Sequence, residues 1–581
     1  MNVFDVLTMI GGLCLFLFGM NIMGSALERR AGGSLRSVLK KMTTNKAAGL
    51  FTGLGVTSVI QSSSATTVMV VGFVNSGLMS LKQAINVIMG ANIGTTVTAW
   101  ILSLSGIESD NVIVKLFKPT SFAPILALIG ILLYMFFKDN KKKDTGMILL
   151  GFATLMFGMD TMSGAVAGLA DVPAFREIFL LFKNPLLGVL VGAVLTGIIQ
   201  SSSASVGILQ ALAATGQISF GAAIPIIMGQ NIGTCVTSLI SCVGTNKNAK
   251  RAAVVHLLFN VIGTVVWLII YYIVEWFVSP ALFDETATAW GIAVAHSAFN
   301  ILCTVILLPQ TGLLEKLAYI IVKDGKTKDT VTRLDERLIA TPSIALERCR
   351  ALAVQMGETA CASLKNSLSC IKRYDAALAK DIREKEDETD KLEDSLGTYL
   401  IKLSAENMSD ADSAEAAGLL KVIGDFERLA DHSVNIVESA EEMRDKKLTF
   451  TDEAKAELDV IMGAVTEIVD LANNAFINND IGAAVNVEPL EQVIDELKKK
   501  LRTNHITRLQ KGQCTVIAGF VWEDLLTNLE RTSDHCSNIA GCLVDMSEHN
   551  MNTHESLRAL RNNSEEYFDK YKAYTAKYEL R

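Results

Sequence analysis

Apolar and polar positions divide the chain into two halves of different character. Between Met1 and about Leu308 long apolar stretches follow one another with few charges, whereas Lys, Glu, Asp and Arg are frequent from about Lys316 onward. About 20 consecutive apolar residues form a helix long enough to cross the hydrocarbon core of a bilayer. The pattern therefore predicts a membrane-embedded first half and a soluble second half.

Seven apolar stretches reach the length of a membrane-spanning helix. They are residues 5–26, 83–105, 119–137, 147–166, 221–243, 252–277 and 291–309. Two more stretches, 47–78 and 186–217, are each divided by a polar segment into pieces that are too short to cross. Irregular backbone at membrane depth is tolerated where it lines a cavity in the protein. We therefore expect these two stretches to form re-entrant hairpins.

The apolar half is a tandem duplication. Three motifs recur 139 positions later: Phe18-Gly19-Met20 as Phe157-Gly158-Met159, Gln61-Ser62-Ser63-Ser64 as Gln200-Ser201-Ser202-Ser203, and Asn92-Ile93-Gly94-Thr95 as Asn231-Ile232-Gly233-Thr234. Three motifs at one spacing indicate two copies of one unit. Because each copy has an odd number of crossings, we expect inverted-topology repeats in the membrane.

Basic residues indicate how the chain is oriented. They cluster in three segments: Arg29, Arg30, Lys40 and Lys41, then Lys138 and Lys141 to Lys143, then Lys247, Lys250 and Arg251. Cytoplasmic loops are enriched in Lys and Arg, so these segments are expected inside, with Asp284-Glu285 outside and Lys115 and Lys118 as exceptions. This predicts a multi-pass protein of the cell (inner) membrane with its N-terminus outside and its C-terminal half in the cytoplasm.

Beyond Leu308 apolar residues recur at spacings of three and four, which predicts long amphipathic helices in bundles. The predicted fold class is therefore all-α throughout. The expected parts are transmembrane repeat 1 (1–138), transmembrane repeat 2 with an extra helix (144–310), a linker (311–344), a cytoplasmic helical domain (345–560) and a tail (561–581). The helical domain is itself duplicated, because Glu427-Arg428-x-x-Asp431-His432-x-x-Asn435 recurs 103 positions later as Glu530-Arg531-x-x-Asp534-His535-x-x-Asn538.

The hairpin tips place amides and hydroxyls where the bilayer is apolar. A broken helix exposes N–H groups that suit an oxyanion, and carbonyl and hydroxyl oxygens that suit a hard cation such as Na⁺. The Gly-x-Asn-Ile-Gly-Thr segments are expected to add a mid-span break at glycine and further oxygens. The candidate ligands are Gln61, Ser62, Ser63, Ser64, Thr66, Asn92, Thr95, Gln200, Ser201, Ser202, Ser203, Asn231 and Thr234. Packing between membrane helices is the alternative role of such serines, but two runs in register favour a site.

The coupling ion is expected to be sodium. A proton-coupled carrier normally needs acidic or histidine side chains in its membrane helices. The duplicated polar groups are neutral, and the counterpart of Asp160 in the other copy is Asn21. For His256 and His296 we expect polar packing between helices. The net charge of −8, without a Lys/Arg tract, argues against nucleic acid as a partner.

The paired Gln-Ser-Ser-Ser segments, each followed about thirty residues later by Gly-x-Asn-Ile-Gly-Thr, resemble the sodium/phosphate cotransporter family, the type II Na/Pi symporters and their bacterial relatives. The resemblance covers roughly residues 1–310 and implies an elevator-like carrier whose paired segments line the phosphate and sodium sites. The first copy continues Ala65-Thr66-Thr67 and the second Ala204-Ser205-Val206. This difference predicts that the two hairpins are not equivalent.

Residues of about 345–560 resemble the PhoU family, pairs of three-helix bundles involved in phosphate signalling. The resemblance implies a divalent or trivalent metal bound by acidic side chains that lie four residues apart on one helix face. The candidate ligands are Glu386, Asp390, Glu427, Asp431, Glu491, Asp495, Glu530 and Asp534. The alternative is a solvated acidic surface. We expect Arg428 and Arg531 to pair with neighbouring acids.

Together these features predict a non-enzymatic, sodium-coupled carrier of inorganic phosphate in a lipid bilayer, with a PhoU-like regulatory domain. Two alternatives stay open: a carrier of another oxyanion or small carboxylate, and a membrane-tethered phosphate sensor that transports little. The sequence has no complete Gly-x-x-x-x-Gly-Lys-Ser/Thr phosphate loop for ATP. A homo-oligomer, the direction of flux and the identity of any metal are left open.

Overall fold

A computed structural model describes residues 3–41, 45–106, 118–167, 184–278, 280–324, 334–406, 408–548 and 565–580. Within these residues the chain is helical, and its β-structure consists of one isolated bridge between Ser219 and Thr286. The chain forms two compact units, Met1–Thr341 and Pro342–Arg581. The division falls inside the predicted linker. The all-α class is confirmed.

Each of the seven predicted crossings is a helix in the first unit. They are α1 (Val3–Lys41), α4 (Leu81–Ser103), α6 (Pro119–Phe136), α7 (Asn140–Ala167), α11 (Phe220–Ser241), α12 (Lys247–Phe277) and α13 (Ala289–Leu307). By length and hydropathy, six of these qualify as membrane spans on their own. The remaining one, α6, has 18 residues, about 27 Å at 1.5 Å per residue. The first unit is thus a multi-pass membrane unit.

Two helical hairpins complete the membrane core. The first consists of α2 (Lys46–Ile60) and α3 (Ser63–Asn75), and the second of α9 (Pro185–Ile199) and α10 (Ser202–Ala213). The longest arms have 15 residues, about 22 Å, which is less than the hydrocarbon thickness.

Both hairpins return to the side from which they start. In the first, Gly49 near the start of α2 packs against Asn86 near the start of α4, and α3 leads into α4 through a short turn. In the second, Gly188 in α9 packs against Pro225 near the start of α11. The predicted re-entrant hairpins are therefore confirmed.

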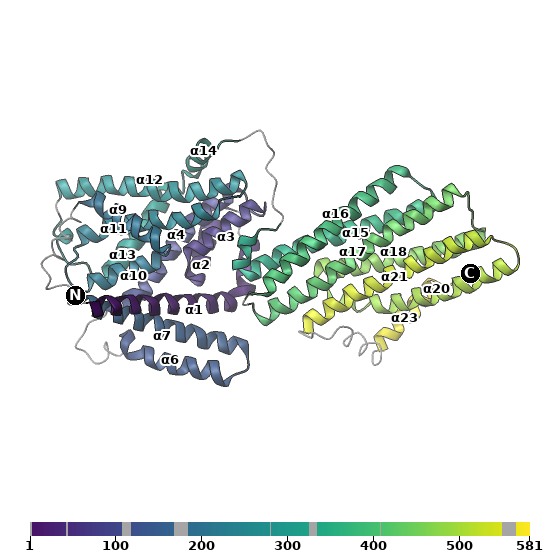
Figure 1. Ribbon diagram of the computed structural model, residues 1–581, viewed down its shortest axis with the longest axis horizontal. Helices are drawn as coiled ribbons and strands as arrows, with labels where there is room; N and C mark the ends of the chain where they lie inside the picture. The colour runs from purple at the N-terminus through teal and green to yellow at the C-terminus, as the bar shows by residue number, and fades with distance from the viewer. Residues whose placement is uncertain are drawn as a thin grey trace. The chain divides into compact units, whose positions relative to one another are not determined.

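Glycines let α1 and α7 approach until their backbones touch. A Cβ at Gly19 would lie 2.6 Å from the Gly151 carbonyl oxygen, and a Cβ at Gly158 would lie 2.7 Å from that of Gly12. Gly12 and Gly151 are equivalent positions of the two copies, as are Gly19 and Gly158, so the contacts are reciprocal. Figure 1 shows α1, α6 and α7 side by side.

The expected mid-span breaks in the Gly-x-Asn-Ile-Gly-Thr segments are wrong. Both α4 and α11 run through the motif without interruption. Their glycines instead admit the backbone of the hairpin arm beside them. A Cβ at Gly90 would lie 1.9 Å from the Leu50 oxygen in α2, and one at Gly229 would lie 2.0 Å from the Val189 oxygen in α9.

The second arm of each hairpin packs among helices of the other copy. The α3 arm contacts α11 and α12, and the α10 arm contacts α4 and α1. Large apolar side chains are exposed elsewhere along the unit, among them Phe4, Phe136 and Trp276. Such a surface is typical of lipid-facing helices. The second arms of the hairpins are thus buried in the protein, whereas the outer helices have a surface suited to lipid.

The described residues of the second unit form six long helices. They are α15 (Pro342–Lys372), α16 (Ala376–Ser404), α17 (Asp410–Asp445), α18 (Asp452–Asn478), α20 (Val487–Gln510) and α21 (Val516–Glu548), joined by the short α19 (Ile481–Ala484) and followed by α23 (Glu565–Lys577). The first three pack together, as do α18, α20 and α21, and α17 packs against α21. This arrangement confirms the predicted pair of three-helix bundles. The apolar helix α18 is long enough to span a membrane, but its apolar face is buried in the bundle.

Candidate functional site

The two hairpin tips line one cavity of about 390 Å³ in the membrane unit. All eight residues of the duplicated motif face it, namely Gln61, Ser62, Ser63, Ser64, Gln200, Ser201, Ser202 and Ser203. Helix α1 completes the wall with Leu17, Met20, Asn21, Gly24, Ser25 and Glu28. Residues 139 positions apart in the chain are thus brought to one place.

The glutamine of each motif ends the first arm of its hairpin. Gln61 and Gln200 have φ of 59° and 57°, the left-handed conformation. Their backbone N–H groups donate to the carbonyl oxygens of Thr57 and Thr196. A positive φ is uncommon outside glycine and concentrates at functional sites. Both copies keep the same strained residue at the tip.

The first serine of each motif begins the second arm. The Ser62 and Ser201 hydroxyls accept hydrogen bonds from the third amide of α3 and α10, at 3.2 Å in both cases. The first two amides of a helix have no carbonyl partner within it. Here they belong to the serines that follow, which line the cavity. Two helix N-termini, each with a partial positive charge, therefore face one space and suit an oxyanion.

The two hairpins differ in how their hydroxyls are paired. In the first, Thr57 donates to Thr66 at 3.0 Å, and Thr98 donates to the side-chain oxygen of Gln61 at 2.9 Å. In the second, the equivalent hydroxyls are buried without a hydrogen-bond partner among the described residues: Thr196, Ser205 and Thr237. Both glutamines line the cavity, but the Gln200 side chain is exposed whereas that of Gln61 is buried. The second hairpin thus differs from the first in having three buried hydroxyls without a hydrogen-bond partner among the described residues.

Five predicted ligands do not line the cavity: Thr66, Asn92, Thr95, Asn231 and Thr234. Thr95 and Thr234 donate to carbonyls four residues earlier in their own helices, at 3.0 and 2.9 Å. The Asn231 amide does the same at 2.9 Å. This is the packing role typical of hydroxyls in membrane helices. The structure does not bring these five side chains to the hairpin cavity.

His256 is a polar contact between helices. Its Nε2 lies 3.3 Å from the Asn92 side-chain oxygen in α4, and its Nδ1 lies 3.1 Å from the Ser238 hydroxyl in α11. The ring is fully buried on α12. It therefore joins one copy to the other, as expected from its sequence setting.

A second polar network lies at the end of α3. The Asp335 carboxylate accepts a hydrogen bond from the Asn75 side chain at 2.7 Å, and Asn75 accepts one from the Asn246 backbone at 2.8 Å. The Asp335 side chain is 2% exposed. Leu338, fully buried, packs against Gly72 of α3, where a Cβ would lie 2.9 Å from the leucine. The segment directly before the second unit is therefore docked on the first hairpin.

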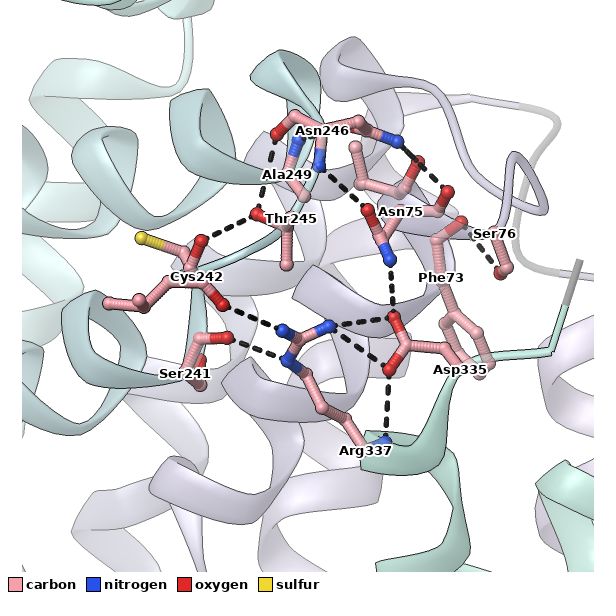
Figure 2. A network of polar contacts seen from close by, with 12 residues as sticks. Phe73, Asn75, Ser76, Ser241, Cys242, Thr245, Asn246, Ala249, Asp335 and Arg337 are labelled. Carbon is pink, nitrogen blue, oxygen red and sulfur yellow. Dashed lines mark hydrogen bonds and ion pairs between the residues drawn. The ribbon is translucent and has the colours of Figure 1, made fainter. Parts of the chain in front are cut away.

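Arg337 extends this network to the turn between α11 and α12. Its Nη1 lies 3.0 Å from the Oδ2 of Asp335, and its Nε and Nη2 donate to the carbonyls of Ser241 and Val243 at 2.6 and 3.0 Å. Figure 2 shows the guanidinium between the Asp335 carboxylate and that turn. We call residues 335–338 the docking segment. It joins α3 of one copy to α11 of the other.

In the second unit the duplicated histidines form the contact between the two bundles. His432 lies 2.9 Å from the Asn528 side-chain oxygen, and His535 lies 2.9 Å from that of Asp425. Asp425 and Asn528 are themselves 103 positions apart, so the contacts are reciprocal. The two imidazole centroids are 5.5 Å apart. The histidines of the repeated motif thus hold the bundles together.

The acidic side chains of each bundle lie near one another. Burial raises the pKa of Glu386, and Asp431 and Asp390 raise it further. Burial likewise raises the pKa of Asp534 to about 6, with Glu530 as the next cause. Several acids also have ion pairs: Arg428 with Glu427 and Asp431, Lys498 with Glu530, and Lys499 with Asp495. The expected pairing of Arg428 with acids is confirmed.

These acids are not arranged as a metal site. Throughout the described part of the chain, no group of three or more His, Cys, Asp or Glu side chains is placed to hold a metal ion. Burial and, after it, neighbouring carboxylates nevertheless raise the pKa of Glu386, Glu427 and Asp534, and a bound cation would relieve the repulsion. Metal binding by the two acidic groups stays a prediction.

Comparison with known proteins identifies both units. A family model described as Na⁺/Pi-cotransporter matches residues 15–164 and 169–279, and a PhoU domain model matches residues 353–440 and 460–543. The YqeW protein of Bacillus subtilis (strain 168) is 30% identical over 308 residues, which cover 53% of this chain and 95% of that protein. The chain belongs to the Na⁺/Pi-cotransporter family. Its second unit carries a PhoU domain.

Two other relatives extend the comparison. The YjbB protein of Escherichia coli (strain K12), whose name describes inorganic phosphate export, is 24% identical over 550 residues, or 93% of this chain and 97% of that protein. Sodium-dependent phosphate transport protein 2A of Rattus norvegicus is 40% identical over 98 residues, or 16% of this chain and 15% of that protein. The similarity to YjbB spans both the cotransporter unit and the PhoU domain.

Sequence reasoning missed two parts of this protein. Glu28 lines the hairpin cavity, but its position 139 residues later is Ala167, and only duplicated groups were considered as ligands. The docking segment was assigned to a linker because nothing in its composition distinguishes it. The sequence signal that could have revealed Glu28 is a single carboxylate one helical turn beyond Gly24-Ser25 in an apolar helix.

The acidic groups predict a pH dependence of the PhoU domain. A folded-state pKa of about 6 for Asp534, against 3.8 ordinarily, means that the folded domain holds this proton more tightly than the unfolded chain. Its contribution to stability is therefore complete below about pH 3.8 and is lost as pH rises to about 6. We expect Asp534→Asn to raise the unfolding free energy at pH 7 by about 1 kcal/mol, allowing for solvent screening. Thermal unfolding between pH 4 and 8 measures this.

The matched control is Asp387→Asn, which removes an exposed carboxylate. It should leave the pH profile of stability unchanged. Added Mn²⁺ should stabilise the wild-type domain more than the Asp534→Asn variant if the acids bind metal. Equal pH profiles for wild type and Asp534→Asn would contradict the prediction.

Proposed function

We propose that the protein is a sodium-coupled secondary transporter of inorganic phosphate with a regulatory PhoU domain. The observation that carries this proposal is the convergence of both Gln-Ser-Ser-Ser tips on one cavity. Four backbone amides and the six serine hydroxyls of the two motifs are available there to donate to an oxyanion, and no Lys or Arg lines the cavity among the described residues. Uncharged, preoriented donors suit a transported anion, because the site must bind the anion and also release it.

Sodium is the coupling ion in this proposal. The hydroxyls of Thr196, Ser205 and Thr237, which have no hydrogen-bond partner within the described part of the chain, offer oxygen ligands beside the second tip. The rat relative is named as sodium-dependent, and the family description names Na⁺. Oxygen ligands without a thiolate or imidazole suit a hard cation.

The arrangement of the hairpins supports alternating access. The first hairpin opens toward the end of α11, where Asn75 meets Asn246, and the second opens toward its start, where Gly188 meets Pro225. Two hairpins that open in opposite directions and meet at their tips are what inverted repeats would produce. A site between them can open to either side in turn.

The PhoU domain is proposed to lie in the cytoplasm and to regulate transport through the docking segment. Basic residues near that segment support a cytoplasmic location. Lys247, Lys250 and Arg251 begin α12 next to Asn246, and Lys and Arg are enriched in cytoplasmic loops. The name of YjbB describes export. A carrier of this type is reversible, so the direction of net flux follows the gradients of sodium and phosphate.

Flux of labelled phosphate into proteoliposomes tests the function. We expect uptake against the phosphate gradient when sodium is imposed outside, and none when choline replaces sodium. Arsenate should compete as a structural analogue. Phosphate binding without sodium-driven flux would instead identify a membrane-tethered sensor, and flux of sulfate or a carboxylate in preference to phosphate would identify another cargo.

A further inference from the structure

The hairpin cavity contains one ionisable side chain among its lining residues, Glu28 of α1. Its Oε1 is buried and has no hydrogen-bond partner among the described residues. The neighbouring cation does not neutralise it by direct contact, because the Arg29 guanidinium is 2.8 Å from the Asp144 carboxylate. The Glu28 carboxylate therefore offers a hydrogen-bond acceptor at the cavity wall, whereas the other polar side chains of the lining can all donate hydrogen bonds.

A carboxylate is an unexpected neighbour for an oxyanion. Two negative charges repel strongly where water is excluded. Inorganic phosphate, however, keeps at least one O–H group near neutral pH, and so does arsenate, whereas sulfate is fully deprotonated. A carboxylate can therefore accept a hydrogen bond from phosphate or arsenate, but it meets only acceptors on sulfate.

We propose that Glu28 is a specificity-determining residue that accepts a hydrogen bond from the protonated oxygen of phosphate and excludes sulfate. The inference rests on the proposed phosphate transport and adds the basis of its selectivity. A site built to bond a substrate hydroxyl rejects an analogue that lacks it far more strongly than shape alone allows, because a buried polar group is left unpaired. The serines and amides then supply binding, and Glu28 supplies discrimination.

The test compares Glu28→Gln with Glu28→Asp in the full-length protein. Labelled phosphate uptake into proteoliposomes is measured with increasing sulfate or arsenate outside. In the wild type, arsenate should compete and sulfate should not. In Glu28→Gln the sulfate inhibition constant should fall by at least about tenfold, the scale of a hydrogen bond to a charged group. Glu28→Asp, which keeps the carboxylate, should still exclude sulfate.

Asp160→Asn is the matched control. It removes a carboxylate from α7 at an exposed position that does not line the cavity. It should behave as wild type toward sulfate, arsenate and sodium. If Glu28→Gln loses transport, equilibrium binding to the purified variant measures the selectivity instead, as the ratio of the dissociation constants of phosphate and sulfate.

Three results would overturn the inference. The first is unchanged exclusion of sulfate in Glu28→Gln, and the second is sulfate competing as well as arsenate in the wild type. The third is a weaker sodium dependence in Glu28→Gln with unaltered anion selectivity, which would make Glu28 a cation ligand. A wild-type protein that neither binds nor transports phosphate refutes the proposed function instead, so the two failures are distinguishable.

Discussion

Replacing Ser202 by proline should weaken phosphate binding about tenfold to a hundredfold while the protein still folds. Ser202 is the first residue of α10, where its backbone N–H has no carbonyl partner in the helix and faces the cavity. Proline is well tolerated at this helix position and removes only that N–H and the hydroxyl. The residue before it, Ser201, has φ −137° and ψ 108°, a conformation that a following proline accepts. A lost hydrogen bond to an anion is worth roughly 1.5–3 kcal/mol.

The matched control is Ser202→Ala, which removes the hydroxyl and keeps the amide. The difference in phosphate dissociation constant between the two variants isolates the amide. Thermal unfolding verifies that both are folded. Ser63→Pro and Ser63→Ala repeat the test at the first tip, where Ser62 has φ −144° and ψ 105°. If proline and alanine variants bind phosphate equally well at both tips, the helix N-termini are not the anion site.

Removing the Asp335 carboxylate should destabilise the membrane unit by about 3 kcal/mol. Asp335→Ala leaves the Arg337 guanidinium and the Asn75 amide without their shared acceptor, and breaking one side of a buried ion pair costs roughly 3–5 kcal/mol. Arg337 is 25% exposed, so the lower end of that range applies. The effect on transport should be a flux that no longer depends on the PhoU domain, because α3 is released from the docking segment.

Thermal unfolding and sodium-driven phosphate flux measure the two effects. Asp335→Asn is the control, since it keeps a side-chain acceptor for Asn75 and loses only the charge. A chain ending at Thr341 retains the docking segment and should be more stable than one ending at Asp324. Equal stability of these two truncated chains, together with unchanged flux in Asp335→Ala, would show that the segment neither supports nor regulates the carrier.

The sequence was sufficient for the membrane architecture. Apolar length predicted the seven crossings, and a polar run in the middle of an apolar stretch predicted each hairpin, because a helix that cannot span must turn back. The common spacing of 139 between Gln61 and Gln200 also predicted that the two tips belong to one site. Apolar periodicity predicted helical bundles in the second half, because apolar helix faces must be buried, and the resemblance to the PhoU family implied that there are two of them.

The role of the repeated glycines could not be derived from sequence. Gly90 and Gly229 permit either a break in a helix or close packing against another, and composition does not distinguish the two. The structure shows that these glycines serve close packing, because carbonyl oxygens of α2 and α9 occupy the space that a Cβ would fill. For the same reason the sequence did not reveal that Thr95 and Thr234 donate hydrogen bonds to carbonyl oxygens of their own helices.

By itself the sequence determined which segments are apolar, where they break, and that each half is duplicated, because these depend on local composition and on spacing along the chain. Tertiary structure alone decided which polar groups share a cavity and which pair elsewhere. Glu28 and Asp335 show why: each gains its role from groups distant in sequence, the hairpin tips for one, and Asn75 for the other. Burial and contact are properties of the packed chain, so a single unduplicated side chain leaves no pattern that reveals them.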